Sequence, residues 1–359
     1  MASVEAFREY HPEWNVFVIG REHAFEGDPT VSEEAAAAGM LGARFYPLRT
    51  GRLTRTWTSG TLTSLLKVPL GIAGAFTLLR RHRPDIILSF GGYIALPVVI
   101  AGWVLGIPAI THEQASVPGL ANRIIGIFAK KILTAFPDTV RAFPAAKTKF
   151  IGLPLRSVIL HPPLSSDITA GKGPVIYITG GTTGSDSINR LVYPIASRLA
   201  ARYTVIHQVG RRWINEARRF RNTLRGDKRR RYLVFPYLDA QDHAYILFRM
   251  HFLVGRSGAN TVYELGVTGK PALLIPLPWS AAGEQQANAG ILVRQGSAKS
   301  LNQYQLTPEK LISEIIDFSG GIDASLAGAR KHRTDWPTGA QLSIVSEIVE
   351  YLSFRGGNK

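Results

Sequence analysis

Short apolar runs alternate with helix-like runs through both halves of this chain, and glycine or proline marks most of the junctions. In the second half, strand-like runs cover residues 175–179, 203–209, 232–235, 250–254 and 272–275. Alternation of this kind is typical of parallel sheets whose helices cover both faces. Because 359 residues are enough for two such sheets, we expect an α/β protein with two doubly wound domains and a ligand cleft between them.

Residues 86–111 form an uncharged stretch, which raises the question of a membrane span. A spanning helix needs about 20 unbroken apolar residues, and four glycines and two prolines interrupt this stretch. The interruptions favour a strand over 86–90, a helix over 94–105 and a strand over 108–111. Upstream, residues 62–83 are expected to be helical with a break at Pro69.

The net charge of +16 predicts an anionic partner, such as nucleic acid, acidic lipid or a phosphorylated substrate. The absence of cysteine excludes disulfides, cysteine-zinc sites and thiol nucleophiles. Residues 1–13 carry charge and lack an apolar core, so no signal peptide is expected. The sequence has no D-x-D pair and no His/Asp cluster with metal-ligand spacing, so no metal and no cofactor are expected.

Residues 255–264, G-R-S-G-A-N-T-V-Y-E, join a strand-like run to a helix-like run that closes at Gly269. A helix N-terminus presents backbone N–H groups and Arg256 adds a cation, so this turn is suited to holding a phosphate. Glu264 follows within two helical turns and can accept from two sugar hydroxyls. We interpret the segment as part of a nucleotide or nucleotide-sugar site.

A second glycine loop, T-G-G-T-T-G-S over residues 179–185, follows a strand and precedes a helix. Its backbone N–H groups and hydroxyls suit a phosphate, although an ordinary β-α turn explains the glycines equally well. Farther along, Glu284, Gln285 and Asn288 share one face at the start of a helix. They suit sugar hydroxyls, with a solvated helix N-terminus as the alternative.

Two strand ends in the first half carry glycine or polar residues: F-G-G-Y at 90–93 and I-T-H-E-Q at 110–114. His112 and Glu113 are adjacent, so their side chains face opposite ways on an extended segment. A catalytic role for either residue and a satisfied polar pair fit this pattern equally well.

Two regions of the chain are strongly basic. Residues 211–231 hold ten Lys/Arg against two acids, which favours a solvated helix and loop. Because no recognition motif accompanies them, no nucleic-acid partner is expected. Residues 35–84 hold eight Lys/Arg, no acid and a stripe of Leu, Ile and Phe. This mixture suits either an anionic membrane surface or a buried helix with arginine at its ends.

In combination, several motifs resemble the MurG family of bacterial glycosyltransferases, from about Glu5 to the final helix. They are F-G-G-Y, H-E-Q-x-x-x-P-G-L-A-N, G-x-P-x-R, G-G-T-T-G, H-Q-V-G, R-S-G-A-x-T-x-x-E and E-Q-x-x-N-A. The resemblance implies a GT-B fold of two Rossmann-like domains. It also implies inverting, metal-independent transfer of N-acetylglucosamine from UDP-N-acetylglucosamine to lipid I, forming lipid II in peptidoglycan synthesis.

The resemblance further implies a peripheral protein on the cytoplasmic face of the cell membrane, with an anionic membrane surface as a partner. The expected domains are an acceptor and membrane-facing domain over 1–155 and a donor domain over 156–338. A final helix over 339–359 is free to pack back on the first domain.

Motifs and resemblance together give the expected site. On the acceptor side lie Gly91, Gly92 and Tyr93, with His112 and Glu113 as the catalytic candidates. The donor-binding residues are expected to be Arg156, Thr182, Thr183, Gly184, Leu238, Arg256, Ser257, Gly258, Ala259, Asn260, Thr261, Val262, Glu264, Glu284, Gln285 and Asn288.

The resemblance assigns the ribose hydroxyls to Glu264, uracil to Leu238, and the N-acetylglucosamine hydroxyls to Gln285 and Asn288. Two departures stand out. Ala115 replaces an asparagine of the family, and the family's first strand with its G-G-T-G-G-H loop, which carries a candidate base, is expected to be missing. The alternatives are a UDP-N-acetylglucosamine 2-epimerase and a catalytically impaired donor-binding protein.

Overall fold

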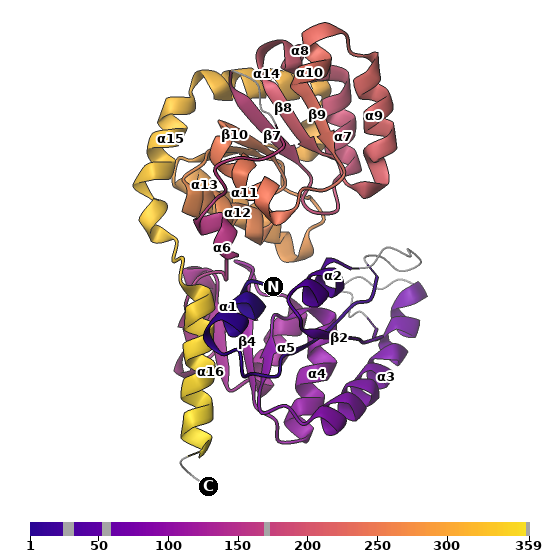
Figure 1. The fold of residues 1–359 in the computed structure, drawn as a ribbon, viewed down its shortest axis with the longest axis vertical. Helices are drawn as coiled ribbons and strands as arrows, with labels where there is room; N and C mark the ends of the chain where they lie inside the picture. Colours follow the sequence, from indigo (N-terminus) through magenta and orange to yellow (C-terminus); the bar gives the residue numbers. More distant parts are fainter. Residues whose placement is uncertain (24–31, 52–58, 169–172, 357–359) are drawn as a thin grey trace. The chain divides into compact units, whose positions relative to one another are not determined.

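The computed structural model describes residues 1–23, 32–51, 59–168 and 173–356. The chain divides into two compact units. Unit 1 comprises Met1–Arg156 and Thr338–Lys359, and unit 2 comprises Ser157–Pro337. Helices and strands carry the labels of Figure 1.

Within the described residues, unit 2 is built on one parallel sheet of six strands with the spatial order β12-β11-β10-β7-β8-β9. The strands are β7 (Val175–Thr179), β8 (Thr204–Gln208), β9 (Tyr232–Phe235), β10 (Phe252–Gly255), β11 (Ala272–Leu274) and β12 (Ala298–Ser300). The α-helices are α6 (Ser157–Leu160), α7 (Asp186–Val192), α8 (Ala196–Arg202), α9 (Ile214–Thr223), α10 (Gly226–Arg231), α11 (Ala240–Arg249), α12 (Ala259–Thr268), α13 (Glu284–Arg294), α14 (Pro308–Gly320) and α15 (Ile322–Lys331).

The central strands of this sheet are buried along their whole length. β7, β8 and β10 contain only buried residues, as expected for parallel strands covered on both faces. Their side chains, including Ile176, Val205 and Val254, form a core with α7, α8 and α14. This core fixes the carboxyl ends of the strands, where the candidate site lies.

Two expectations for unit 2 need correction. The single helix expected after the T-G-G-T-T-G-S loop is divided into α7, a 3-10 turn over Tyr193–Ile195, and α8. The turn contains Pro194, which has no N–H to donate to the preceding turn. The edge strand β12 was not predicted, because the sequence A-K-S is short and pairs with a neighbour on one side only.

Unit 1 contains two separate parallel sheets in its described residues, β1-β2 and β3-β4-β5-β6. The strands are β1 (Phe17–Gly20), β2 (Arg44–Pro47), β3 (Ile87–Ser89), β4 (Ala109–Glu113), β5 (Lys131–Thr134) and β6 (Thr148–Phe150). The α-helices are α1 (Ala2–Tyr10), α2 (Glu33–Met40), α3 (Ser59–His82), α4 (Gly92–Val104), α5 (Leu120–Phe128) and α16 (Ala340–Gly356). Short β6, T-K-F, is another strand that was not predicted.

The uncharged stretch 86–111 forms β3, α4 and the start of β4, so its predicted β-α-β character is confirmed. The predicted break at Pro69 is wrong, because α3 continues through that proline as a single helix. Among the helices described, none is both long and apolar enough to span a membrane.

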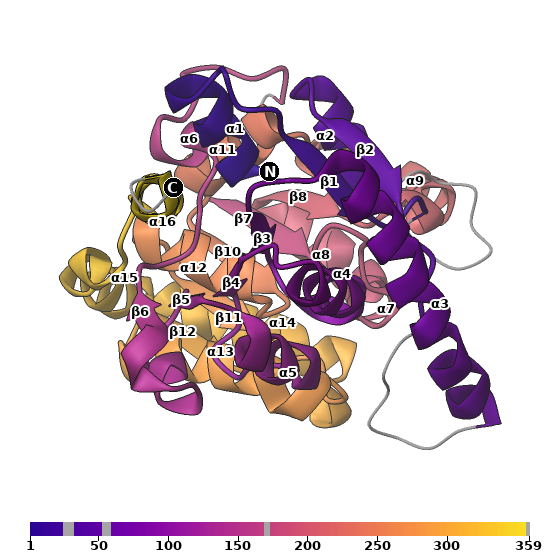
Figure 2. The ribbon, with the colours of Figure 1, turned by 90° about the horizontal axis from the view of Figure 1, so that it is seen from below.

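The last helix, α16, belongs to unit 1 although it follows unit 2 in the chain. Ile344 and Ile348 of α16 share a core with Phe7 of α1. Glu347 also forms ion pairs with Lys131 (2.6 Å) and Lys149 (2.8 Å). Figure 1 shows α16 beside α1, and Figure 2 shows the same pair with α16 seen end-on. Apolar contact and charge pairing therefore hold the chain's last helix on unit 1.

Candidate functional site

The strand order of unit 2 creates a topological switch point between β7 and β10. The chain runs outward from β7 to β8 and β9, and later returns to the other side of β7 to form β10. Ligands of doubly wound sheets bind in the crevice beyond the strand ends at such a point. Both glycine motifs of the second half lie here, since T-G-G-T-T-G-S follows β7 and G-R-S-G follows β10.

Arg256 joins these loops from a buried position. Its backbone N–H donates to Thr179 O (3.2 Å). Its guanidinium donates through Nη1 to Ile275 O (2.9 Å), and through Nη2 to Ser185 Oγ (3.0 Å) and Ser187 Oγ (2.7 Å). Three chain segments after β7, β10 and β11 are therefore held together by one side chain.

The charge of Arg256 lies inside the protein. The residue is 6% exposed, and burial lowers the pKa of its guanidinium to about 10, which leaves it cationic at neutral pH. In the part of the chain that the structure describes, no carboxylate lies within ion-pair distance of it. A buried cation without a carboxylate partner makes the loops around it favourable for an anion.

The N-terminus of α12 points to the same chemistry. The helix begins after Gly258 without a side-chain cap. The first N–H groups of a helix have no partner within it, so those of residues 259–261 are left for solvent or a ligand. Such groups, together with the positive end of the helix dipole, attract a phosphate.

Several side chains around the start of α12 are buried or bonded within the protein. Ser257 is fully buried and its hydroxyl donates to Gln285 O (2.8 Å). Val262 is fully buried as well. Asn260 is exposed and Ala259 is half-buried. The predicted diphosphate residues of this segment therefore offer mainly their backbone.

The T-G-G-T-T-G-S loop forms a tight turn closed by Gly184 N–H donating to Gly181 O (3.0 Å). Both glycines have positive φ, +76° and +88°. A side chain on Gly184 would collide with the backbone of Val209, so the loop packs directly on the chain after β8. Thr182 and Thr183 are exposed at the tip, where their hydroxyls are accessible to a ligand.

Glu264 lies in the second turn of α12 with its side chain 13% exposed. Its Oε2 accepts a hydrogen bond from His243 Nε2 (2.9 Å), a residue of α11 that the sequence analysis did not select. Leu238, the predicted uracil contact, is 4% exposed. The next residue, Asp239, caps α11 by accepting from Asp242 N–H (2.9 Å).

The polar residues at the start of α13 hold neighbouring loops. Gln285 Oε1 accepts from Leu277 N–H (2.9 Å). Asn288 is fully buried and donates to Ser257 O (3.1 Å). Burial raises the pKa of Glu284, which also accepts from Asn288 (3.5 Å). The sugar contacts expected of these side chains stay predictions, and the structure gives Asn288 a role in fixing the turn after β10.

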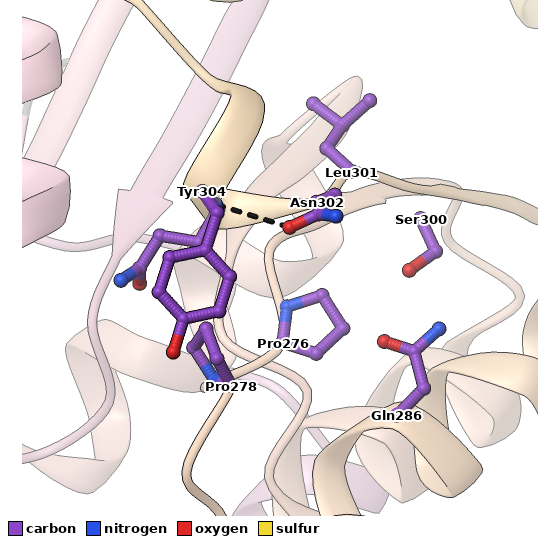
Figure 3. A pocket seen from close by; sticks show the side chains of 8 residues that line it. Pro276, Pro278, Gln286, Ser300, Leu301, Asn302 and Tyr304 are labelled. Carbon is purple, nitrogen blue, oxygen red and sulfur yellow. Dashed lines mark hydrogen bonds between the residues drawn. The ribbon is translucent and has the colours of Figure 1, made fainter.

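A pocket of about 390 Å³ adjoins this region, at the carboxyl ends of β11 and β12. In Figure 3 the side chains of Gln286 and Ser300 point toward the same space beside Pro276. Gln303, another wall residue, accepts from Ser187 Oγ (3.3 Å), which also bonds to Arg256. The remaining lining residues are Pro278, Leu301, Asn302 and Tyr304. The pocket itself was not predicted, because its residues come from three separate segments.

In unit 1, the catalytic candidates His112 and Glu113 lie inside β4 and are both buried. His112 Nε2 bonds to Gly152 O (2.8 Å), and burial lowers the pKa of its imidazole to about 4. Glu113 accepts from Ala115 N–H (2.9 Å) and from Asn122 Nδ2 (2.7 Å). Neither residue is exposed, and their contacts are those of a satisfied polar pair, while a catalytic role for either stays a prediction.

The F-G-G-Y loop packs on this buried pair. Gly91 has φ +77°, and a side chain there would collide with the amide of Asn122. Gly92 also has positive φ, and Tyr93 is half-buried in the first turn of α4. Glu113 therefore fixes Asn122, and Asn122 fixes the path of the loop.

Arg156 is the last residue of the first segment of unit 1 and is half-buried. Its charge contributes to lowering the pKa of the Met1 amino group, whose burial is the larger cause. Arg156 therefore lies outside unit 2, and its contact with the nucleotide stays a prediction.

Unit 1 also carries an exposed apolar surface at the ends of α4 and α5, which we call the Trp103 surface. Trp103 is 58% exposed, Val104 60% and Ile127 71%. The rings of Trp103 and Phe128 lie 5.3 Å apart, so the two helix ends are neighbours. Arg123 lies on α5 and Lys130 follows it, and Lys147 of the 3-10 turn Ala145–Lys147 donates through Nζ to Ile127 O (3.3 Å). Residues 35–84, for which the sequence suits either a membrane surface or a buried helix, include 52–67, whose side chains lie outside the described ones.

Two family models match this chain. The glycosyltransferase family 28 N-terminal domain matches residues 14–134, and the glycosyltransferase family 28 C-terminal domain matches residues 175–333. The first lies in unit 1 and the second in unit 2.

Curated relatives cover nearly the whole chain. A Bacillus cereus protein named "UDP-N-acetylglucosamine--N-acetylmuramyl-(pentapeptide) pyrophosphoryl-undecaprenol N-acetylglucosamine transferase 2" is 30% identical over 95% of this chain and 91% of its own length. A Geobacillus kaustophilus transferase, whose name differs only in lacking the final number, is 31% identical over 94% of this chain and 91% of its own length.

Solved structures share the fold. The crystal structure of Acinetobacter baumannii MurG has a TM-score of 0.68 at 23% identity, covering 97% of this chain and 94% of that one. A UDP co-structure of S. aureus MnaA has a TM-score of 0.69 at 12% identity, covering 98% and 93%. The predicted GT-B fold with two Rossmann-like domains is confirmed.

Proposed function

The chain belongs to the MurG family of glycosyltransferases, and we propose that it transfers N-acetylglucosamine from UDP-N-acetylglucosamine to lipid I, forming lipid II in peptidoglycan synthesis. The observation that carries the donor half of this proposal is the convergence at the switch point of unit 2. There, buried Arg256 ties together the loops after β7, β10 and β11. The uncapped start of α12 and the carboxylate of Glu264 lie on the same helix.

These groups match the parts of a nucleoside diphosphate sugar. The N–H groups of residues 259–261 and the T-G-G-T-T-G-S loop would hold the diphosphate. The carboxylate of Glu264 would accept from the ribose hydroxyls, since an ionised carboxylate has only acceptors to offer. The sugar would enter the pocket at the carboxyl ends of β11 and β12, which is lined by Gln286, the neighbour of Gln285.

In the proposed reaction, a hydroxyl oxygen of lipid I attacks the anomeric carbon on the side opposite the diphosphate, which inverts that centre. The bond between the anomeric carbon and the diphosphate oxygen breaks, and UDP leaves with the electron pair. The negative charge that develops on UDP would be met by the α12 N-terminus and Arg256, so the proposal needs no metal. The acceptor's proton passes to a base.

We assign the buried pair of unit 1 to holding the acceptor loop rather than to being that base. A histidine with a pKa of about 4 binds protons weakly at neutral pH. Glu113 already accepts from Ala115 N–H and Asn122. The F-G-G-Y loop that they support would face lipid I.

We propose further that the Trp103 surface rests on the anionic cytoplasmic face of the membrane. Exposed aromatic and aliphatic side chains next to Lys and Arg suit the boundary between lipid headgroups and acyl chains. Lys and Arg near that surface add electrostatic attraction to acidic lipids.

The transfer is tested by incubating the full chain with labelled UDP-N-acetylglucosamine and a lipid I analogue in detergent. The expected product is labelled lipid II with release of one UDP per transfer. A chain that binds UDP-N-acetylglucosamine tightly and yields no labelled lipid contradicts the proposal. Conversion of the donor to its manno epimer without acceptor would instead support the 2-epimerase, whose fold is similar.

The membrane contact is tested by sedimentation with vesicles of mixed anionic and neutral phospholipid. The double variant Trp103→Ala, Ile127→Ser is expected to bind at least about tenfold more weakly than wild type, because it loses two exposed apolar groups that would enter the membrane. Leu164→Ser is the matched control, because Leu164 is a fully exposed apolar residue of unit 2. Equal binding of the double variant and wild type would exclude the Trp103 surface.

A further inference from the structure

A partly buried line of polar side chains runs from Glu264 to the backbone of the T-G-G-T-T-G-S loop. His243 Nε2 lies 2.9 Å from Glu264 Oε2, and His243 Nδ1 lies 3.4 Å from Tyr177 Oη. Tyr177 donates to Gln208 Oε1 (2.9 Å), and Gln208 Nε2 donates to Gly181 O (3.1 Å). This line of side chains thus runs from α12 through α11, β7 and β8 to the turn after β7.

The donors and acceptors at the two ends of this line are fixed by chemistry. The 3.4 Å contact between His243 Nδ1 and Tyr177 Oη has no proton to share when the proton of Tyr177 goes to Gln208 and that of His243 is on Nε2. Gly181 O only accepts, so the amide of Gln208 must direct its nitrogen there and its oxygen toward Tyr177. An ionised carboxylate has no proton, so the contact between His243 and Glu264 requires an N–H on Nε2. One lone pair of Glu264 Oε2 is used in this way, and Oε1 stays available to a ligand.

Burial makes these contacts stronger than their surface counterparts. Tyr177 is 1% exposed and Gln208 4%, and the side chains of His243 and Glu264 are 19% and 13% exposed. Burial, with a smaller contribution from the charge of Glu264, raises the pKa of Tyr177 well above its ordinary value. The phenol therefore keeps the proton that it donates to Gln208, and hydrogen bonds in such a partly dry environment constrain geometry effectively.

Accepting this donor assignment, we propose that His243 is a positioning residue that holds the Glu264 carboxylate in the orientation required by two ribose hydroxyls. The inference rests on the proposed function. A free glutamate loses rotamer freedom when it engages a ligand, whereas one already held by His243 loses less.

Calorimetry with UDP and 2′-deoxy-UDP on the full chain tests this role. The ratio of the two affinities measures how well Glu264 engages the ribose diol, and it does not respond to general loss of stability. His243→Gln keeps an N–H donor near the Nε2 position, whereas His243→Asn places its amide near Nδ1 and cannot reach Glu264. A matched control is His332→Phe, which removes a histidine contact to Asp335 (2.8 Å) at the end of α15.

Wild type and His332→Phe are expected to prefer UDP by about tenfold or more, as one charged hydrogen bond provides. His243→Asn is expected to lose most of that preference, and His243→Gln to keep most of it. If His243→Asn retains the wild-type preference, the positioning role is wrong. If His243→Gln loses it as fully as His243→Asn, contact with Glu264 is not what matters and the inference also falls.

The proposed function fails by a different result. If wild type binds 2′-deoxy-UDP as tightly as UDP, or binds neither, the ribose role of Glu264 itself is wrong. Thermal unfolding of each variant, with and without UDP, identifies any protein that has lost its fold.

Discussion

The two units are built from the same alternation of strands and helices, but their sheets differ at the centre. In unit 2, β7 pairs with β8 on one side and β10 on the other, so one sheet runs through the switch point. In the described residues of unit 1, β1 pairs only with β2 and β3 only with β4. A doubly wound sheet brings two loops together where its direction reverses, and only unit 2 shows both of them.

This difference shows in the chemistry of the two sites. At the switch point of unit 2, the two loops share buried Arg256, and Glu264 keeps part of its carboxylate accessible. In unit 1, the polar groups His112 and Glu113 are buried and bonded to their own surroundings. Unit 2 therefore gathers a buried cation and a partly exposed carboxylate at its switch point, whereas the described part of unit 1 shows the support for a single loop.

The largest effect is expected from acid, because each unit contains a fully buried histidine. Burial lowers the pKa of His112 in unit 1 to about 4 and of His207 in unit 2 to about 3. Unfolding returns each to about 6.5, so below that pH the unfolded chain binds more protons and the free energy of unfolding falls. Between pH 6.5 and 4, protonation of His112 in the unfolded chain is expected to lower the free energy of unfolding by about 3 kcal/mol.

Urea unfolding at several pH values, followed separately in each unit by hydrogen exchange, checks this expectation. His112→Gln should flatten the pH dependence of unit 1 and leave that of unit 2 unchanged. A pH profile of unit 1 that is the same with and without His112 would show that other groups cause its acid sensitivity.

The next largest effect concerns Arg256. Arg256→Met is expected to weaken UDP binding about a hundredfold, because it removes a buried charge and the donors that hold three loops. Arg256→Lys keeps the charge and should lose less. Arg190→Met is the control, since Arg190 forms an exposed ion pair with Asp186 on α7 (2.9 Å). Wild-type UDP affinity in folded Arg256→Met would remove the main support for a donor site at the switch point.

Two carboxylates, one in each unit, sharpen the comparison further. Glu264→Ala is expected to weaken UDP binding by about 1.5–3 kcal/mol, through loss of charged hydrogen bonds to the ribose. Glu113→Gln, in unit 1, should leave UDP affinity unchanged. Titration calorimetry measures both, and a weakened UDP affinity in Glu113→Gln would mean that the nucleotide is not bound by unit 2 alone.

The smallest effect is expected from two glycines with nearly the same positive φ, Gly91 (+77°) and Gly184 (+76°). Alanine at positive φ costs about 1 kcal/mol. Gly91→Ala meets the side chain of Asn122, which can move aside only by losing its hydrogen bond to Glu113, whereas Gly184→Ala meets the backbone of Val209, which has no rotamer to change. Thermal unfolding should therefore show a loss of about 1 kcal/mol for Gly91→Ala and about 2 kcal/mol for Gly184→Ala. The reverse order would contradict the packing of the two loops.

Much of the fold was predictable because it depends on local patterns. The apolar runs at β7 and β9 gave the strand bounds, and glycines and prolines gave the β-α-β unit over 86–111. Errors occurred where packing overrides a local rule. Pro69 remains inside α3, and the short edge strands β6 and β12 depend on a neighbour rather than on their own sequence.

The site was predictable to a smaller extent. Glycine loops and Glu264 stand out in the sequence because backbone geometry demands particular residues at a strand-helix turn. His243, Tyr177 and Gln208 carry no such pattern, since they lie on three elements that meet only in the folded sheet. Trp103 and Ile127 similarly become one surface only because α4 and α5 end side by side.

The sequence by itself determined the fold class, the family and the loops that face the switch point, since these follow from periodicity and turn chemistry along neighbouring residues. Only the tertiary structure decided which polar groups are free to meet a ligand. It buried His112, Glu113 and Asn288, kept part of Glu264 exposed, and set Arg256 beneath the loops. The physical reason is that burial and hydrogen bonding depend on groups brought together from distant segments, and a linear pattern does not contain that proximity.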